Sequence, residues 1–172
     1  DGEFSIGFVD WNPLPRDRNM GIFREVFLEV NEGVKIRSPF VHSKVNKETL
    51  NEAELFIQAE LINSSDKTID GILRVDYEIG VVEKPVSVKA GETLTCNFNP
   101  EDFEQLSVKD VNFWWPNGMG AASLYNLKTE FIAKNTVIDK VEKKYGIREV
   151  TSYLNEDKNR AFEVNGKFVL IK

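Results

Sequence analysis

The fold class is decided by the stretch Ala53-Glu54-Leu55-Phe56-Ile57-Gln58-Ala59-Glu60-Leu61, which lies within a chain of 172 residues. Apolar side chains occupy every second position from Ala53 to Leu61, and most of the positions between them are polar. Successive side chains of a β-strand point to opposite faces, so a period of two predicts a strand with one face in the core and the other in water.

The same period returns before and after this stretch. It appears in residues 73–79, in residues 125–133 and in residues 137–145, and residues 86–88 lead through Ala90-Gly91-Glu92 into residues 94–98 as strand, turn and strand. Long stretches with the 3.6-residue period of a helix are missing. We therefore predict an all-β chain folded as an immunoglobulin-like antiparallel β-sandwich. A single cysteine rules out the disulfide of antibody domains but leaves the broader sandwich class open.

Both ends of the chain differ from this middle. Residues 4–19 indicate a short strand followed by a long loop, and residues 21–28 are predicted to resume as a strand. Near the other end, two apolar runs flank Asn165-Gly166, which is typical of a hairpin with a type I′ turn. The chain stops at Lys172 within an apolar strand, so we expect the sequence to be cut from a longer protein.

The composition of the chain limits the classes of partner that it can bind. The 22 basic and 28 acidic side chains give a formal net charge of -6, which offers no source for the electrostatic attraction that drives nucleic-acid binding. No apolar run approaches the roughly 20 residues that a membrane helix needs, and Asp1-Gly2-Glu3 carries no positive charge typical of a signal peptide. We expect neither a nucleic-acid nor a membrane partner, and localisation stays open.

His42 and Cys96 are the only residues of their kinds. A Cys-His dyad or a triad built on His42 can be written, but His42 lies in an alternating stretch without a nucleophile motif and Cys96 lies in a predicted strand. Both are interpreted as strand residues, and acidic side chains such as Glu54 and Glu60 as the solvated face of a sheet. One cysteine cannot assemble a cysteine-based zinc site, and no other metal or cofactor site is evident, so none is expected.

Three segments resemble glycoside hydrolase family 2. Asp10-Trp11-Asn12-Pro13, taken with residues 17–26, resembles the end of its N-terminal sugar-binding domain. Trp114-Trp115-Pro116-Asn117-Gly118-Met119-Gly120 resembles a late-strand signature of its immunoglobulin-like domain. Residues 146–150 and 162–171 resemble the approach to its catalytic barrel. The three occur in the order of the family, and their form is most similar to the exo-β-D-glucosaminidase and β-mannosidase branch.

The resemblance implies a domain plan and a function. Residues 1–28 would end the sugar-binding domain, residues 29–150 would form the sandwich, and residues 151–172 would lead into a barrel that supplies the catalytic carboxylates after Lys172. Retaining chemistry needs two carboxylates about 5 to 5.5 Å apart. The chain itself would be non-catalytic, and its partners would be the flanking domains of the same protein. That parent protein would be periplasmic or secreted and would act on a β-glucosaminide or β-mannoside. The alternative is a free-standing carbohydrate-binding or adhesion module.

The resemblance also implies site residues. Asp10 and Trp11 match a loop that touches the terminal sugar in the mannosidase branch, where a carboxylate accepts from hydroxyls and an indole packs on a pyranose ring. Without the resemblance, Asp10 caps the loop and Trp11 packs beneath it. Trp114 and Trp115 point to opposite faces if extended, so we expect one in the core and the other at a domain contact. Arg148 is the third expected domain-interface residue, a surface salt bridge being its plain alternative.

Overall fold

The computed structural model describes residues 22, 24–26, 28, 30 and 33–170. It divides the chain into residues 1–30 and a compact unit of residues 31–172. Asp10 and Trp11 lie outside the described residues. The strand predicted for residues 21–28 is not seen at the described positions 22, 24–26 and 28, which have no strand conformation. Ile22, Val26 and Leu28 are at least 79% exposed, and no described strand pairs with this stretch, although a strand needs a neighbour for its backbone hydrogen bonds.

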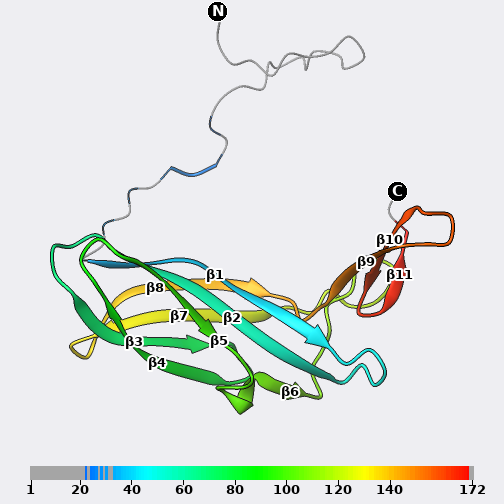
Figure 1. The fold of residues 1–172 in the computed structure, drawn as a ribbon, viewed down its shortest axis with the longest axis horizontal. Coiled ribbons are helices and arrows are strands. Elements are labelled where there is room, and N and C mark those ends of the chain that lie inside the picture. The colour runs from blue at the N-terminus through cyan, green and yellow to red at the C-terminus, as the bar shows by residue number, and fades with distance from the viewer. Residues whose placement is uncertain (1–21, 23, 27, 29, 31–32, 171–172) are drawn as a thin grey trace, which may run out of the picture. The chain divides into compact units, whose positions relative to one another are not determined.

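Two antiparallel sheets form the sandwich, which confirms the predicted all-β fold class (Figure 1). In one sheet the order is β1-β2-β5, with β6 also paired to β2, and in the other it is β4-β3-β7-β8. A short 3₁₀ turn, η1 (Glu104–Leu106), precedes β6. The strands are β1 (Val34–Val45), β2 (Glu52–Asn63), β3 (Ile69–Asp76), β4 (Val81–Val88), β5 (Thr93–Phe98), β6 (Ser107–Lys109), β7 (Tyr125–Ala133) and β8 (Thr136–Tyr145).

The core between the sheets follows the alternation of the sequence. The five apolar side chains of β2 at positions 53, 55, 57, 59 and 61 are at most 5% exposed, as the period of two predicts. Leu73 and Val75 of β3 and Leu127 and Phe131 of β7 complete the same buried cluster from the other sheet. Each sheet therefore contributes one apolar face, and burial of these faces is the main stabilising term.

The structure adds one detail to the sequence prediction and changes another. β4 and β5 belong to different sheets, so the turn closed by the bond from Glu92 N–H to the Lys89 carbonyl (3.1 Å) crosses the sandwich. β3 ends at Asp76, and Ile79 lies in the following turn with 40% of its surface exposed. That turn is closed by the Tyr77 N–H, which donates to the Gly80 carbonyl and ends the ladder.

A small third sheet follows the sandwich, in the order β11-β10-β9 (Figure 1). Its strands are β9 (Val150–Leu154), β10 (Arg160–Val164) and β11 (Lys167–Val169). Asn165 and Gly166 have φ angles of 51° and 75°, which confirms the predicted turn. β9 was not predicted. The described residues contain no helix long and apolar enough to cross a membrane.

The first strand lies at the edge of its sheet, beside β8. An irregularity separates Arg37 from Phe40 in its pairing with β2. Near its start, the Ile36 N–H donates to Asp139 Oδ2 of β8 (2.6 Å), and at its end the Val45 N–H donates to Glu149 Oε2 (2.8 Å). Carboxylates therefore satisfy the outward-pointing N–H groups at both ends of this edge.

Candidate functional site

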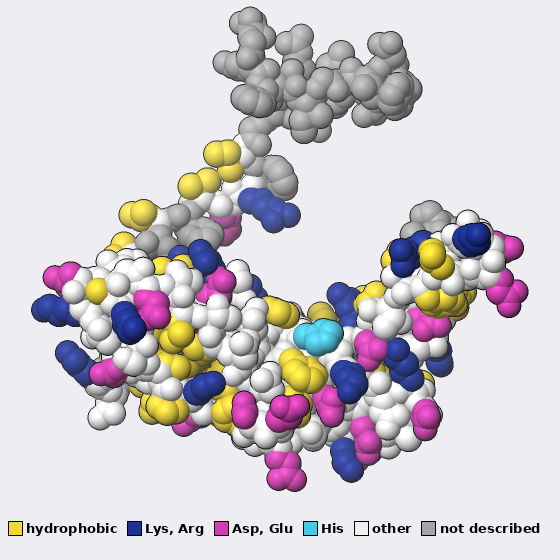
Figure 2. Space-filling view, in the orientation of Figure 1, with side chains coloured by type: hydrophobic (Ala, Val, Ile, Leu, Met, Phe, Trp, Pro, Cys, Tyr) yellow, Lys and Arg dark blue, Asp and Glu magenta, His cyan; other side chains and the backbone are white. Residues whose placement is uncertain are grey.

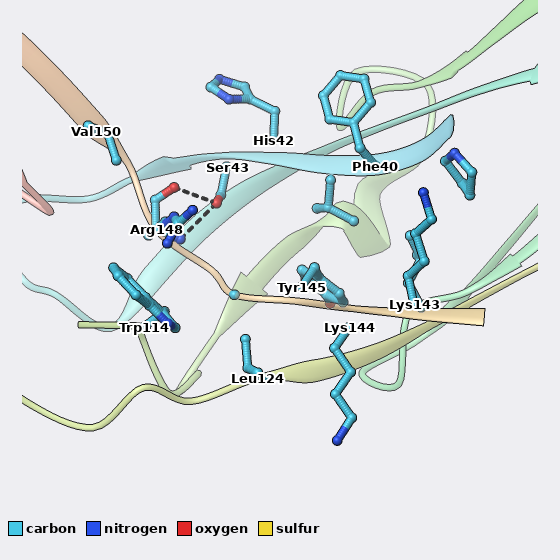
Figure 3. Close-up of a pocket in the computed structure, with 14 residues that line it drawn as sticks. Phe40, His42, Ser43, Trp114, Leu124, Lys143, Lys144, Tyr145, Arg148 and Val150 are labelled. Atoms are coloured by element: carbon cyan, nitrogen blue, oxygen red, sulfur yellow. Dashed lines mark hydrogen bonds between the residues drawn. The ribbon is translucent and has the colours of Figure 1, made fainter. Parts of the chain in front are cut away.

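Trp114 and Arg148, two of the predicted interface residues, meet where the chain leaves the sandwich. The Trp114 N–H donates to the Ile147 carbonyl (2.9 Å), which ties the Trp-Trp segment to the connection between β8 and β9. The guanidinium carbon of Arg148 lies 4.1 Å from the centroid of the Trp114 ring, and Figure 3 shows the two side chains together. This is a cation–π contact at an exposed site.

Gly146 allows this close packing. A Cβ atom at position 146 would lie 2.7 Å from the Trp114 Cβ and 2.9 Å from its Cγ, distances that real Cβ atoms do not show. Any side chain here would push the indole away from the strand connection. The glycine in the segment Gly146-Ile147-Arg148 is thus explained by the ring that covers it.

Trp115 contacts different partners from Trp114. Its side chain packs against the sandwich core, over Gly120, and Lys167 Nζ of β11 lies 5.0 Å from its ring centroid. Its N–H donates to the Ala121 carbonyl (3.0 Å) and closes the turn between the tryptophans and β7. Both indoles therefore meet cations of the segment that follows β8, Trp114 through Arg148 and Trp115 through Lys167.

Asn165, which sequence reasoning used only for its turn, joins three segments at this junction. Its side chain is 1% exposed. Its N–H donates to the Glu149 carbonyl (2.8 Å), its Oδ1 accepts from the Glu149 N–H (2.9 Å), and its Nδ2 donates to the Trp114 carbonyl (3.1 Å). The hairpin of β10 and β11 is thereby fixed to the sandwich. The Asn-Gly pair signals the turn, but nothing in the sequence signals this bridge.

Glu149 links the same junction to β1. Besides accepting from Val45, its carboxylate pairs with Lys47, with Oε1 2.7 Å from Nζ. Burial, the largest single influence, raises the pKa of Glu149, but the bonds from Lys47 and Val45 and the charges of Lys47 and His42 together hold it below its usual range. The carboxylate is therefore ionised at neutral pH, as both of these bonds require.

Ser43 makes a second link between β1 and the junction. Its side chain is 2% exposed, and its Oγ donates to the Arg148 carbonyl (2.9 Å) and accepts from the Arg148 N–H (3.0 Å), as Figure 3 shows. The serine thus supplies a donor and an acceptor where β1 has no strand neighbour on that side.

A groove of about 510 Å³ runs between β1 and β8 next to this junction. Phe40, His42 and Ser43 line it from β1, Lys143 and Tyr145 from β8, and Trp114 and Arg148 from the junction (Figure 3). A second hollow of about 440 Å³ shares His42 and Val150 with it and reaches Phe56. The His42 ring is exposed, and its centroid lies 5.9 Å from that of Phe56.

Cys96 lies apart from both hollows, buried in β5, where burial raises the pKa of its thiol. Among the described residues there is no group of three or more His, Cys, Asp or Glu side chains that could hold a metal ion. The groove instead combines exposed apolar side chains with cations, an arrangement suited to contact with another polypeptide.

Comparisons with known proteins agree on one family. Residues 34–148 match the family described as "Glycosyl hydrolases family 2". The exo-β-D-glucosaminidase of Streptomyces avermitilis is 34% identical over 168 residues, which cover 98% of this chain and 19% of that protein. The mannosylglycoprotein endo-β-mannosidase of Lilium longiflorum is 31% identical over 176 residues, which cover 95% of this chain and 18% of that protein.

A solved structure shows the same fold. The crystal structure of the exo-chitosanase CsxA of Amycolatopsis orientalis superposes with a TM-score of 0.80 at 31% identity, over 96% of this chain and 19% of that one. The chain thus spans about a fifth of the length of these relatives.

Proposed function

Because this chain belongs to glycosyl hydrolase family 2, whose match covers residues 34–148, we propose that it is a non-catalytic β-sandwich domain of a multidomain retaining β-glycosidase. Residues 1–28 would be the end of a sugar-binding domain, residues 29–150 the sandwich, and residues 151–172 the lead-in to a catalytic barrel. The role of the sandwich is to hold the other two domains in a fixed relation. Misplacing groups by about 1 Å can cost about 100-fold in rate, so such a spacer has kinetic consequences.

One observation carries this proposal: 98% of the chain aligns with only 19% of an exo-β-D-glucosaminidase, at 34% identity. A β-glucosaminide is therefore the first candidate substrate of the parent, and a β-mannoside the second, because of the endo-β-mannosidase relative. The two catalytic carboxylates would lie on the barrel, about 5 to 5.5 Å apart across the scissile bond.

The geometry of the junction supports a positioning role. Asn165, Glu149 and Ser43 fix the exit of the chain from the sandwich with bonds that are at least partly buried. A spacer needs such an exit, since a hinge at this point would let the barrel move relative to the sandwich. Trp114, Trp115 and Arg148 would extend the junction into the domain interface, and Asp10 and Trp11 would reach the terminal sugar.

A turnover panel tests the proposal. Chromogenic β-glucosaminide, β-mannoside, β-galactoside and β-glucuronide are offered to the longer natural protein and, as a control, to this chain alone. We expect the longer protein to hydrolyse the glucosaminide fastest and this chain to hydrolyse none. Hydrolysis by the chain alone would contradict the non-catalytic role. Saturable sugar binding by the chain, with no turnover by the longer protein, would favour a free-standing carbohydrate-binding module instead.

A further inference from the structure

Positive charge without a counter-ion gathers at the groove between β1 and β8, in a chain whose net charge is -6. Away from the groove, some described cations, such as Arg37 and Lys47, pair with carboxylates, and others, such as Lys67 and Lys89, do not. Among the described residues, Lys143 and Arg148 have no carboxylate within ion-pair distance, and the Arg148 guanidinium lies over the Trp114 ring. Figure 3 shows Lys143 reaching from β8 toward β1. Two cations thus face the groove unpaired.

Apolar side chains are exposed around these cations. Phe40 is 49% exposed, Leu124 52% and Val150 58%, and all three line the groove. In Figure 2 the single histidine, cyan, lies among hydrophobic side chains on this face. Contiguous exposed apolar surface next to charge is typical of an interaction site rather than of a free surface.

The backbone of β1 is also open at this place. The Val45 N–H points away from β2, as its bond to Glu149 shows. In an antiparallel ladder, alternate residues point the same way, so the N–H and C=O groups of Val41 and Ser43 also face β8. No described strand pairs with this edge of β1. Asp139 and Glu149 satisfy it at both ends, but the middle opens onto the groove.

We propose that the groove docks an extended segment of the parent chain from outside residues 1–172, one that carries a carboxylate next to an apolar side chain. Lys143 and Arg148 pair with the carboxylate, and Phe40 and Leu124 pack against the apolar side chain beside it. The open edge of β1 hydrogen-bonds to the backbone of the segment. The inference rests on the proposed function. Its occupant follows from charge complementarity and from the four-fifths of the relatives' length that this chain does not span. A protonated amino sugar would be repelled by the same cations.

Hydrogen exchange on the full-length natural protein tests the docking. We expect the N–H groups of Val41 and Ser43, which do not bond to β2, to be protected, and the double variant Lys143→Glu with Arg148→Glu to speed their exchange by at least about tenfold. Because Arg148 also covers Trp114, Lys143→Glu alone is measured as well and should give a smaller increase. The matched control, Lys67→Glu with Lys89→Glu, makes the same charge change outside the groove and should leave the exchange of Val41 and Ser43 unchanged.

The outcomes separate the two proposals. If the Val41 and Ser43 N–H groups exchange freely in the wild type, or equally in wild type and double variant, while the protein hydrolyses a β-glycoside, the docking is wrong and the proposed function stands. If no β-glycoside is hydrolysed, the proposed function fails, whatever the exchange shows. If protection disappears on dilution together with a dimer, the occupant is a second copy and the docking of a parent segment is overturned.

Discussion

Asn165 uses its backbone N–H and both polar atoms of its buried amide at the junction. Replacing it by alanine leaves the Glu149 N–H and the Trp114 carbonyl without partners. We expect Asn165→Ala to lower the free energy of unfolding by about 2 to 4 kcal/mol. Urea denaturation followed by tryptophan fluorescence measures the loss.

The control for this prediction is Asn135→Ala. Asn135 also has a positive φ, 61°, but its side chain is exposed in the turn between β7 and β8. It should lose only the preference of asparagine for this conformation, about 1 kcal/mol. Equal losses in the two variants would mean that the backbone conformation, and not the amide bridge, makes Asn165 important.

Glu149 makes the stability of the junction depend on pH. Its pKa in the folded chain is lowered, so its contribution is fully present above the unfolded pKa of about 4.3 and is lost as the pH falls through the folded value. Glu149→Gln should cost about 1 to 2 kcal/mol at pH 7. The difference in the free energy of unfolding between variant and wild type should become smaller below about pH 4, as measured by unfolding curves at several pH values.

Glu60→Gln is the comparison for Glu149. Glu60 pairs with Arg37, whose side chain is 53% exposed, and such surface pairs contribute about 0 to 1 kcal/mol. If the loss of unfolding free energy in Glu149→Gln stays constant from pH 7 to pH 3, the ionisation of Glu149 does not stabilise the junction.

Among the elements, the edge of β1 is protected by a side chain of the other sheet. Asp139 Oδ2 accepts from the Ile36 N–H at 2.6 Å. Asp139→Ala removes this acceptor, and we expect a loss of about 1 to 2 kcal/mol with faster hydrogen exchange at Ile36. Asp139→Asn keeps an acceptor oxygen and should lose less. Equal losses in the two variants would assign the effect to the charge and not to the hydrogen bond.

Alternation predicted the elements better than it predicted their neighbours. β2, β7 and most of β3 follow directly from side chains that alternate between core and water. The crossing between β4 and β5 could not be predicted, because a Gly-containing turn serves a hairpin and a change of sheet equally well. β9 was missed since its pattern, mostly exposed, lacks a buried face.

The site shows the same limit. The resemblance pointed to Trp114, Trp115 and Arg148, and the structure brings Trp114 and Arg148 into contact. It gave no sign of Asn165 as a bridge or of Ser43 as a second link. The bonds of Asn165 to Trp114 and of Ser43 to Arg148 join residues more than 50 positions apart in sequence, and hydrogen bonds of that kind leave no local pattern.

At the scale of the whole molecule, the third sheet contributes little to any core of its own. Only Ala161 and Val164 are buried among its apolar side chains, whereas Tyr153, Leu154 and Phe168 are at least 43% exposed. Sheets this small are marginally stable alone. Its order therefore depends on the junction with the sandwich, and the variants at Asn165 and Glu149 should disturb the third sheet before the sandwich.

Cys96 is a natural probe of how often the sandwich opens. It is the single thiol of the chain and lies 4% exposed in β5. Burial raises its pKa, with the nearby charge of Lys84 acting in the opposite direction, so the closed protein offers little thiolate to an attacking reagent. An aromatic disulfide reagent would therefore react only when the sandwich opens around Cys96, and the rate of colour release reports that opening without any engineered label.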